Sequence, residues 1–195
     1  MKKIFVIGVC LCWFWASAQD LQNRSTLHLM VDLNSRWYAV VWPITNIRAQ
    51  TPSNFNLFAG AGRRGKNWYV ETMVQKQWNS KGGLWGLDFR YRRQAANRLS
   101  VYLEPAIYPR ERVFYEFAIV EYRVWRKLNL GGETENKHQP GQDVLAAGPR
   151  VSYPIGRLWG TDFMIGSAFR LASPGRNEIR IYFNATRRFA LTDRK

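Results

Sequence analysis

The segment from Asn67 to Trp78 constrains the fold more than any other part of the sequence. Its even positions are mainly apolar and begin and end with tryptophan, whereas its odd positions are mainly polar. Successive side chains of a strand point to opposite faces, so this pattern predicts a strand with one apolar and one polar face. Trp68 and Trp78 are ten positions apart, which is roughly 33 Å along a strand and about 25 Å of height at a tilt of about 40°. That height matches the apolar band of an outer-membrane barrel, with an aromatic residue at each boundary.

The same alternation recurs along most of the chain. It is present in residues 27–33, 55–62, 85–92, 99–107, 145–153, 159–171 and 178–186, which are separated by residues typical of turns. Many of these stretches are longer than an average strand of a soluble protein, which has about 5–6 residues. Long strands joined by short turns favour a barrel over a sandwich. The sequence therefore predicts an all-β fold, an antiparallel up-and-down β-barrel of about 8–10 strands.

Two segments do not follow the simple pattern. Residues 37–44 are apolar on both faces. Residues 112–130 change phase near Ile119, which indicates either a strand with a bulge or a helix, and their β-branched and aromatic content favours the strand. Counting both segments as strands gives ten, and an even number of strands places the N-terminus and the C-terminus of the barrel on the same, periplasmic side. The polar residues 129–143 are then expected to form a long loop outside the cell. The connection at 43–53 is too long for a periplasmic turn, which counts against this arrangement of the strands.

The first residues have the pattern of an export signal. Residues 2–3 are lysines, residues 4–15 are an apolar run, and Ala16–Ala18 form an A-x-A cleavage site. We therefore expect a signal peptide at residues 1–18 and a single barrel domain at residues 19–195. Both cysteines of the chain lie inside the predicted signal, so the exported protein would have no thiol, disulfide or cysteine metal site.

The chain is strongly basic. It has 29 basic and 14 acidic residues, and removing the two lysines of the predicted signal leaves 27 against 14, a net charge of +13. A basic exported protein is suited to anionic lipid headgroups, polyanionic glycans or nucleic acid, but a generally solvated basic surface explains the charge almost as well. Net charge alone therefore identifies no partner.

Residues 60–66, Gly-Ala-Gly-Arg-Arg-Gly-Lys, match two phosphate-binding patterns, G-x-G-x-x-G and G-x-x-x-x-G-K. Such loops need a following helix whose N-terminal amides hold the phosphate. Here the alternating segment after residue 67 predicts a strand, and Asn67 stands where a serine or threonine would bind magnesium. We therefore interpret the motif as a glycine-rich hairpin with flanking basic residues.

No set of residues predicts catalysis. The two histidines, His28 and His138, are far apart in the sequence, and no nucleophile elbow is present. A pair such as His28 with Ser100 is unsupported, and His28 is better interpreted as a polar residue of the lumen or rim. We expect a protein that is not an enzyme and has no catalytic residues, metal or cofactor, although a membrane-embedded lipid hydrolase remains an open third class.

The polar faces of the predicted strands carry many charges. The residues expected to form a paired network in the lumen are Glu71, Asp88, Arg90, Glu104, Arg150, Asp162, Arg170 and Arg180, and Asp32 and Arg92 share these faces. Charges that are buried together must be compensated. In a narrow barrel these side chains would fill the lumen as a plug, whereas a wider barrel leaves space for water.

Several tryptophans stand at the ends of predicted strands. We expect Trp68, Trp78, Trp85 and Trp159 to form membrane-interface belts, with Lys76 reaching toward the headgroups. The other interpretation is that these indoles pack in the core of a soluble β protein.

The last strand pattern completes a resemblance. Ile179, Ile181, Phe183, Ala185 and Phe189 alternate and end on an aromatic residue, with Arg187 interrupting the pattern and six residues following Phe189. Together with the signal and the long strands, this segment resembles the small outer-membrane β-barrel proteins of Gram-negative bacteria, in which the assembly machinery recognises such a strand. The resemblance is to the class and not to one family within it.

This resemblance implies a structural, narrow-pore or surface-interaction role in the cell outer membrane. The expected partners are outer-membrane lipids and the barrel-assembly machinery, with no nucleic acid. The alternative is a soluble periplasmic β-barrel that binds a lipid or small hydrophobic ligand, because alternation alone does not say which face points inward.

Overall fold

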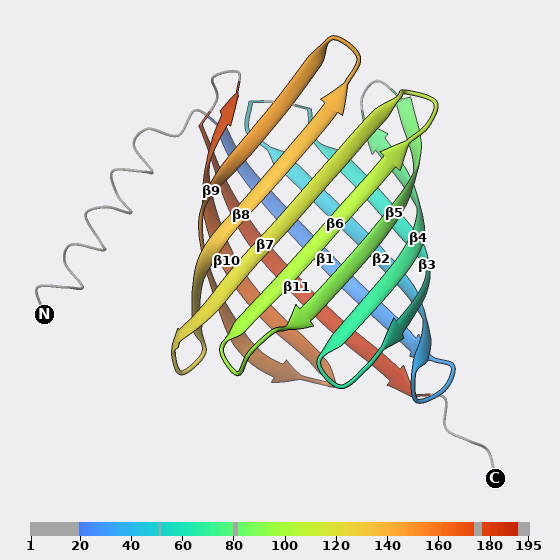
Figure 1. Cartoon of the computed structure of the whole chain (residues 1–195), viewed down its shortest axis with the longest axis vertical. Helices are drawn as coiled ribbons and strands as arrows, with labels where there is room; N and C mark the ends of the chain where they lie inside the picture. The colour runs from blue at the N-terminus through green and yellow to red at the C-terminus, as the bar shows by residue number, and fades with distance from the viewer. Residues whose placement is uncertain (1–19, 51, 80–81, 174–176, 191–195) are drawn as a thin grey trace, which may run out of the picture.

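The computed structural model describes residues 20–50, 52–79, 82–173 and 177–190, and these form one closed β-barrel (Figure 1). The predicted signal peptide and the last five residues lie outside the described residues. The eleven strands are β1 (Asp20–Asp32), β2 (Trp37–Arg48), β3 (Asn54–Arg64), β4 (Trp68–Asn79), β5 (Gly82–Gln94), β6 (Leu99–Tyr108), β7 (Val113–Trp125), β8 (Leu128–Gln139), β9 (Gln142–Leu158), β10 (Thr161–Ser173) and β11 (Glu178–Ala190). Among the described residues, none forms a helix long and apolar enough to cross a membrane.

Each strand pairs with the next in an antiparallel ladder, and the ring closes through β1 and β11. That closing pair is parallel and runs from Asp20 beside Glu178 to Asp32 beside Ala190. An odd number of strands requires one parallel pair, because alternating directions cannot return to the starting direction around an odd ring. The predicted all-β barrel of mainly antiparallel strands is confirmed, and its eleven strands exceed the expected 8–10.

The odd count corrects the predicted placement of the ends. β1 begins at one end of the barrel and β11 finishes at the other, so the first and last strand residues do not share a side (Figure 1). We call the end with the turns after β1, β3, β5, β7 and β9 the lower end, as in Figure 1, and the opposite end the upper end.

The two uncertain segments are both strands. Residues 37–48 form β2, which shortens the connection expected at 43–53, and residues 113–125 form β7, which confirms the preference for a strand over a helix. The register shift in β7 lies between Arg123 and Trp125, and not near Ile119 as expected.

The expected external loop at 129–143 is wrong. These residues form β8, a two-residue turn and the first residues of β9. The outward positions Thr134, Asn136 and His138 of β8 are polar, and in Figure 1 the β8–β9 hairpin projects beyond the neighbouring turns at the upper end. Because the outward residues in this part of β8 are polar, as the inward ones are, the alternation of apolar and polar residues that predicts a strand is absent here.

The apolar faces of the strands point outward. Val70, Val74, Leu87, Leu103 and Ile165 are each 39–50% exposed on the outer surface. The opposite faces carry the buried polar residues of the lumen, and several of these are almost fully buried. The barrel therefore has an apolar outside, whereas its inside combines buried polar and charged residues with apolar clusters, one of which is formed by Tyr38, Val40, Ile44, Phe58 and Met73.

Glycine allows one close contact that shapes the lumen. Tyr38 on β2 pairs with Gly62 on β3, and a Cβ at Gly62 would collide with the Tyr38 ring. The buried Tyr38 hydroxyl donates a hydrogen bond to Glu71 at 2.9 Å. Gly62 thus fixes the position of a ring that holds a buried carboxylate.

We predict that Gly62→Ala destabilises the barrel by about 1–3 kcal/mol, because the added methyl displaces the Tyr38 ring. Gly132→Ala is the matched control, since its Cβ would have its nearest neighbour at 3.6 Å, an ordinary contact. Urea unfolding in detergent, followed by heat-modifiable gel migration, measures both. Equal stability of the two variants would show that the packing of the Tyr38 ring does not require glycine at position 62.

Candidate functional site

The largest group of charges in the lumen lies on β7 to β11. We call it the main ionic cluster, and it consists of Glu121, Glu133, Glu135, Arg150, Arg170, Glu178, Arg180 and Tyr182. Antiparallel strands place every second side chain in the lumen, so residues on different strands meet there at similar heights.

Bonds between strands hold the main ionic cluster together. Arg150 donates to Glu121 at 2.9 Å and to Glu133 at 2.8 Å. Arg170 and Arg180 both donate to Glu135, and both also reach Glu178, at 2.7 Å and 3.2 Å respectively. Each arginine therefore meets at least two carboxylates, which provides the compensation that a buried charge requires.

A second group surrounds Arg90 on β5. Its Nε donates to Asp88 at 2.7 Å and an Nη reaches Glu104 at 3.4 Å. The guanidinium lies 3.8 Å from the centroid of the Trp42 ring and 4.2 Å from that of Phe58. Arg90 is only 2% exposed, so both its charge and its flat faces are occupied by protein groups.

His28 belongs to a third group. Its Nε2 lies 2.9 Å from Oε1 of Glu71, and its ring stacks on Trp42 with centroids 4.1 Å apart. His28 is 5% exposed, which confirms the interpretation of this residue as part of the lumen. Ser100 lines the same cavity as His28, and no hydrogen bond joins the two side chains among the described residues.

The lumen has a wide lower mouth and two inner cavities above it. The mouth, about 550 Å³, shares His28, Tyr69, Arg92 and Thr186 with the first inner cavity. The larger inner cavity, about 240 Å³, occupies the lower part and is also bordered by Asp162. The smaller, about 80 Å³, lies above it and is bordered mainly by asparagine and glutamine side chains. Arg24 and Glu104 border both cavities. The Arg24 guanidinium on β1 lies 5.3 Å from the Phe117 ring centroid on β7, so it reaches across the lumen between the two spaces.

The structure buries seven of the eight predicted lumen residues. Glu71, Asp88, Arg90, Glu104, Arg150, Arg170 and Arg180 are all at most 4% exposed. Asp162 is the exception, because it lies at the end of β10, its side chain is 63% exposed, and its partner is Arg157 at 3.8 Å. The predicted place of Asp162 in the buried network is therefore wrong.

Sequence reasoning missed four carboxylates of the main ionic cluster, namely Glu121, Glu133, Glu135 and Glu178. Glu133 and Glu135 stand in the segment interpreted as a loop, and Glu121 follows the expected phase change in β7. The spacing of Glu133 and Glu135, two residues apart, was the available signal, because it places both on one face of a strand.

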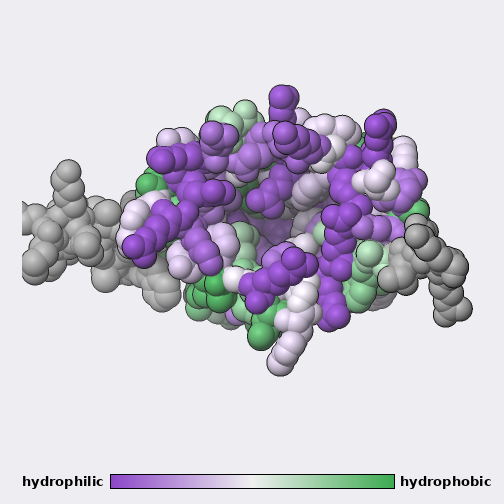
Figure 2. Space-filling model, turned by 90° about the horizontal axis from the view of Figure 1, so that it is seen from below, coloured by the Kyte–Doolittle hydropathy of each residue, from purple (hydrophilic) through white to green (hydrophobic). Residues whose placement is uncertain are grey.

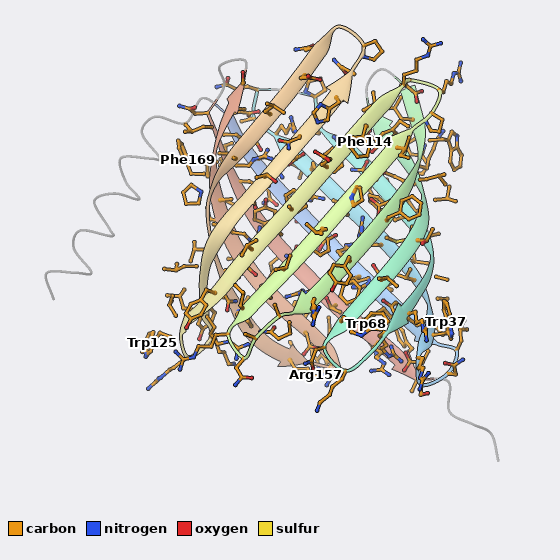
Figure 3. All side chains as sticks on the ribbon, in the orientation of Figure 1. Trp37, Trp68, Phe114, Trp125, Arg157 and Phe169 are labelled. Atoms are coloured by element: carbon orange, nitrogen blue, oxygen red, sulfur yellow. The ribbon has the colours of Figure 1, made fainter. Side chains whose placement is uncertain are left out.

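Aromatic side chains mark both ends of the outer surface. Trp68 and Trp159 lie at the lower end, and Trp78 and Trp85 lie on the upper parts of β4 and β5. All four are exposed, at 37%, 83%, 42% and 59%. The lower end also carries Trp37 and Trp125 (Figure 3), and the upper part carries Phe55 and Phe114. An interfacial role requires exposed aromatic rings near the two ends of the barrel, and the four tryptophans lie there. That role itself stays a prediction.

The lower end is strongly basic. Seen from below, it is a ring of mainly hydrophilic side chains around a hollow centre (Figure 2). The exposed cations on this end are Arg36, Arg63, Lys66, Arg92, Arg93, Arg98, Arg123, Arg126, Lys127, Arg157, Arg187 and Arg188. Three of the arginines lie over exposed aromatic rings, Arg63 over Trp37, Arg126 over Trp125 and Arg187 over Phe189, at 4.8–5.6 Å from the centroids. Three of the cations at this edge are thus stacked on an exposed aromatic ring.

The glycine-rich motif at 60–66 does not precede a helix. Its first five residues end β3 and Gly65 begins the turn to β4, so the interpretation as a hairpin is confirmed. Within the described ranges, no three acidic or histidine side chains come together in a way that would hold a metal ion.

Comparisons with known proteins give no relatives: no protein-family model matches the chain, and neither the curated proteins nor the solved structures contain a match.

We predict that Glu133→Gln lowers the stability of the barrel by about 3–5 kcal/mol, because it leaves buried arginines without a charge that they share. Glu133 accepts hydrogen bonds from Arg150 and from the Tyr182 hydroxyl and is 2% exposed. Asp162→Asn is the control, since its ion pair is exposed and such pairs contribute about 0–1 kcal/mol. Thermal unfolding in detergent compares the two, and similar losses would contradict the role of Glu133.

Proposed function

We propose that this protein is an outer-membrane β-barrel whose lumen is closed by ion pairs and whose role is structural or one of surface interaction. The observation that carries the proposal is the orientation of the two faces. The apolar side chains of the strands are exposed on the outside, while arginines and carboxylates are buried inside. Water does not favour such an outer surface, but hydrocarbon does.

The strands and aromatic residues support the same placement. Most strands have 12 or 13 residues, more than the roughly 9–11 that cross a bilayer when tilted. Trp68 and Trp78 stand at the two ends of β4 with Val70 and Val74 between them, all on the outer face. Aromatic rings at two levels with aliphatic residues between them are typical of a barrel in lipid.

The filled lumen favours a closed barrel over a narrow pore. The main ionic cluster and Arg24 occupy the space between the two cavities, and Arg180 and Asp88 are fully buried. Outer-membrane lipids and the barrel-assembly machinery are the partners of this proposal. The alternating outward residues of β11, including Phe183 and Phe189 at 43% and 41% exposed, are available to the machinery before closure.

The soluble alternative, a periplasmic barrel carrying a hydrophobic ligand, requires an apolar interior. The upper cavity is lined mainly by polar side chains. The lower cavity has a mixed lining, in which apolar residues such as Ile44, Phe117 and Met164 stand beside arginines and hydroxyl groups. The apolar exterior is therefore the feature that opposes this alternative, whereas the apolar part of the lower cavity would suit a small hydrophobic group.

We predict that Val74→Arg weakens folding into phospholipid vesicles by about 2–4 kcal/mol, because Val74 would face the middle of the bilayer. Leu33→Arg is the control, since Leu33 is 57% exposed in the turn after β1 and a charge near the interface costs about 0–1 kcal/mol. Urea titration in vesicles measures both. A soluble barrel would tolerate both arginines equally, and release of the protein from cells without detergent would also exclude the membrane.

We predict that the purified protein adds no stepwise conductance to a planar lipid bilayer, because side chains close the lumen between the two cavities. A barrel reconstituted in vesicles provides the insertion control, since protection of its strands from protease shows that the protein is inserted. A stable unit conductance from inserted protein would contradict the closed lumen and leave the membrane location intact.

A further inference from the structure

A basic groove lies at the lower end of the barrel, between the β1–β2 turn and the β3–β4 turn. Its volume is about 610 Å³, and we call it the hairpin groove. Five cations and one aromatic ring form most of its walls: Arg36, Arg63, Arg64, Lys66, Arg188 and Trp68. Three of the cations come from the glycine-rich motif, whose phosphate-binding pattern the fold otherwise leaves without a role.

The cations of the hairpin groove outnumber the carboxylates available to them. Asp32 pairs with Arg64 at 2.7 Å and with Arg188 at 2.6 Å. Arg36, Arg63 and Lys66 form no ion pair with any carboxylate of the described residues. The groove therefore has a local excess of positive charge that an anion would neutralise.

Aromatic rings place the hairpin groove at the edge of the apolar surface. Trp37 and Trp68 are 47% and 37% exposed at the lower end (Figure 3), and the Arg63 guanidinium lies 5.6 Å from the Trp37 ring centroid. A Cβ at Gly65 would collide with the Trp68 indole, so glycine lets this ring pack against the turn that carries Lys66. Cations beside interfacial indoles lie at the depth of lipid phosphates.

We propose that the hairpin groove binds the phosphate of an anionic lipid headgroup. The inference rests on the proposed function, because only a barrel in a membrane brings Trp37 and Trp68 to the headgroup level. Arginine offers paired N–H donors and lysine a mobile ammonium group, and both are common ligands of phosphate oxygens. Arg63 and Lys66 would contact the phosphate, and Trp68 would border the first methylene groups of the lipid.

Calorimetric titration of the detergent-solubilised protein tests the groove with dihexanoyl phosphatidic acid, with dihexanoyl phosphatidylcholine as the zwitterionic comparison. We expect phosphatidic acid to bind more tightly, and the double variant Arg63→Gln with Lys66→Gln to lose about thirtyfold in affinity at low salt. The matched control, Arg126→Gln with Lys127→Gln, removes one arginine beside an exposed tryptophan and one lysine from the β7–β8 turn of the same end, and should stay within about threefold.

Three results would overturn the inference. These are no preference for phosphatidic acid, equal losses in both double variants, and inorganic phosphate binding as tightly as the lipid. Equal losses would indicate a diffuse charge effect, and tight inorganic phosphate would indicate a site for free anions. All four substituted side chains are exposed, so the variants should fold, which heat-modifiable migration checks. Failure of the proposed membrane location is distinguishable from failure of the lipid-binding inference, because the protein would then be soluble without detergent.

Discussion

Closure of the hydrogen-bonded wall is the constraint on which the rest of this structure depends. Every strand has a partner on both sides, so no edge exposes unpaired backbone groups, and the side chains of each strand must divide between the outside and the lumen. A wall of eleven strands leaves more internal space than one of eight, in which side chains just fill the interior. The long arginine, glutamate and tyrosine side chains occupy much of that added space, and two inner cavities and a lower mouth remain.

Charge is distributed differently inside and at the lower end. In the lumen, carboxylates hold Arg90, Arg150, Arg170 and Arg180, so the interior is cross-linked by ion pairs from β5 to β11. At the lower end, most of the exposed cations form no ion pair among the described residues, and three of them lie over aromatic rings instead. Buried charges of this kind stabilise one arrangement of the strands, whereas unpaired surface cations remain available to other molecules.

The sequence predicted the class of fold well because alternation with a period of two is a direct consequence of strand geometry. It failed where that signal is lost. β8 carries polar residues on both faces in its upper half, so it was interpreted as a loop, and its glutamates were absent from the predicted network. The pairing of Arg180 with Glu135 depends on the register and number of intervening strands, which alternation does not encode. Asp162 has the right parity for the lumen, but it lies too near the strand end to be buried.

The parallel contact of β1 with β11 joins the first and the last strand of the described chain. Thr26 and Asn184, joined by a hydrogen bond across this seam, are 158 positions apart in the sequence. Contacts between such distant residues form slowly. Until the seam forms, β1 and β11 each present an edge of unpaired backbone groups, so closure of this one pair removes both edges at once.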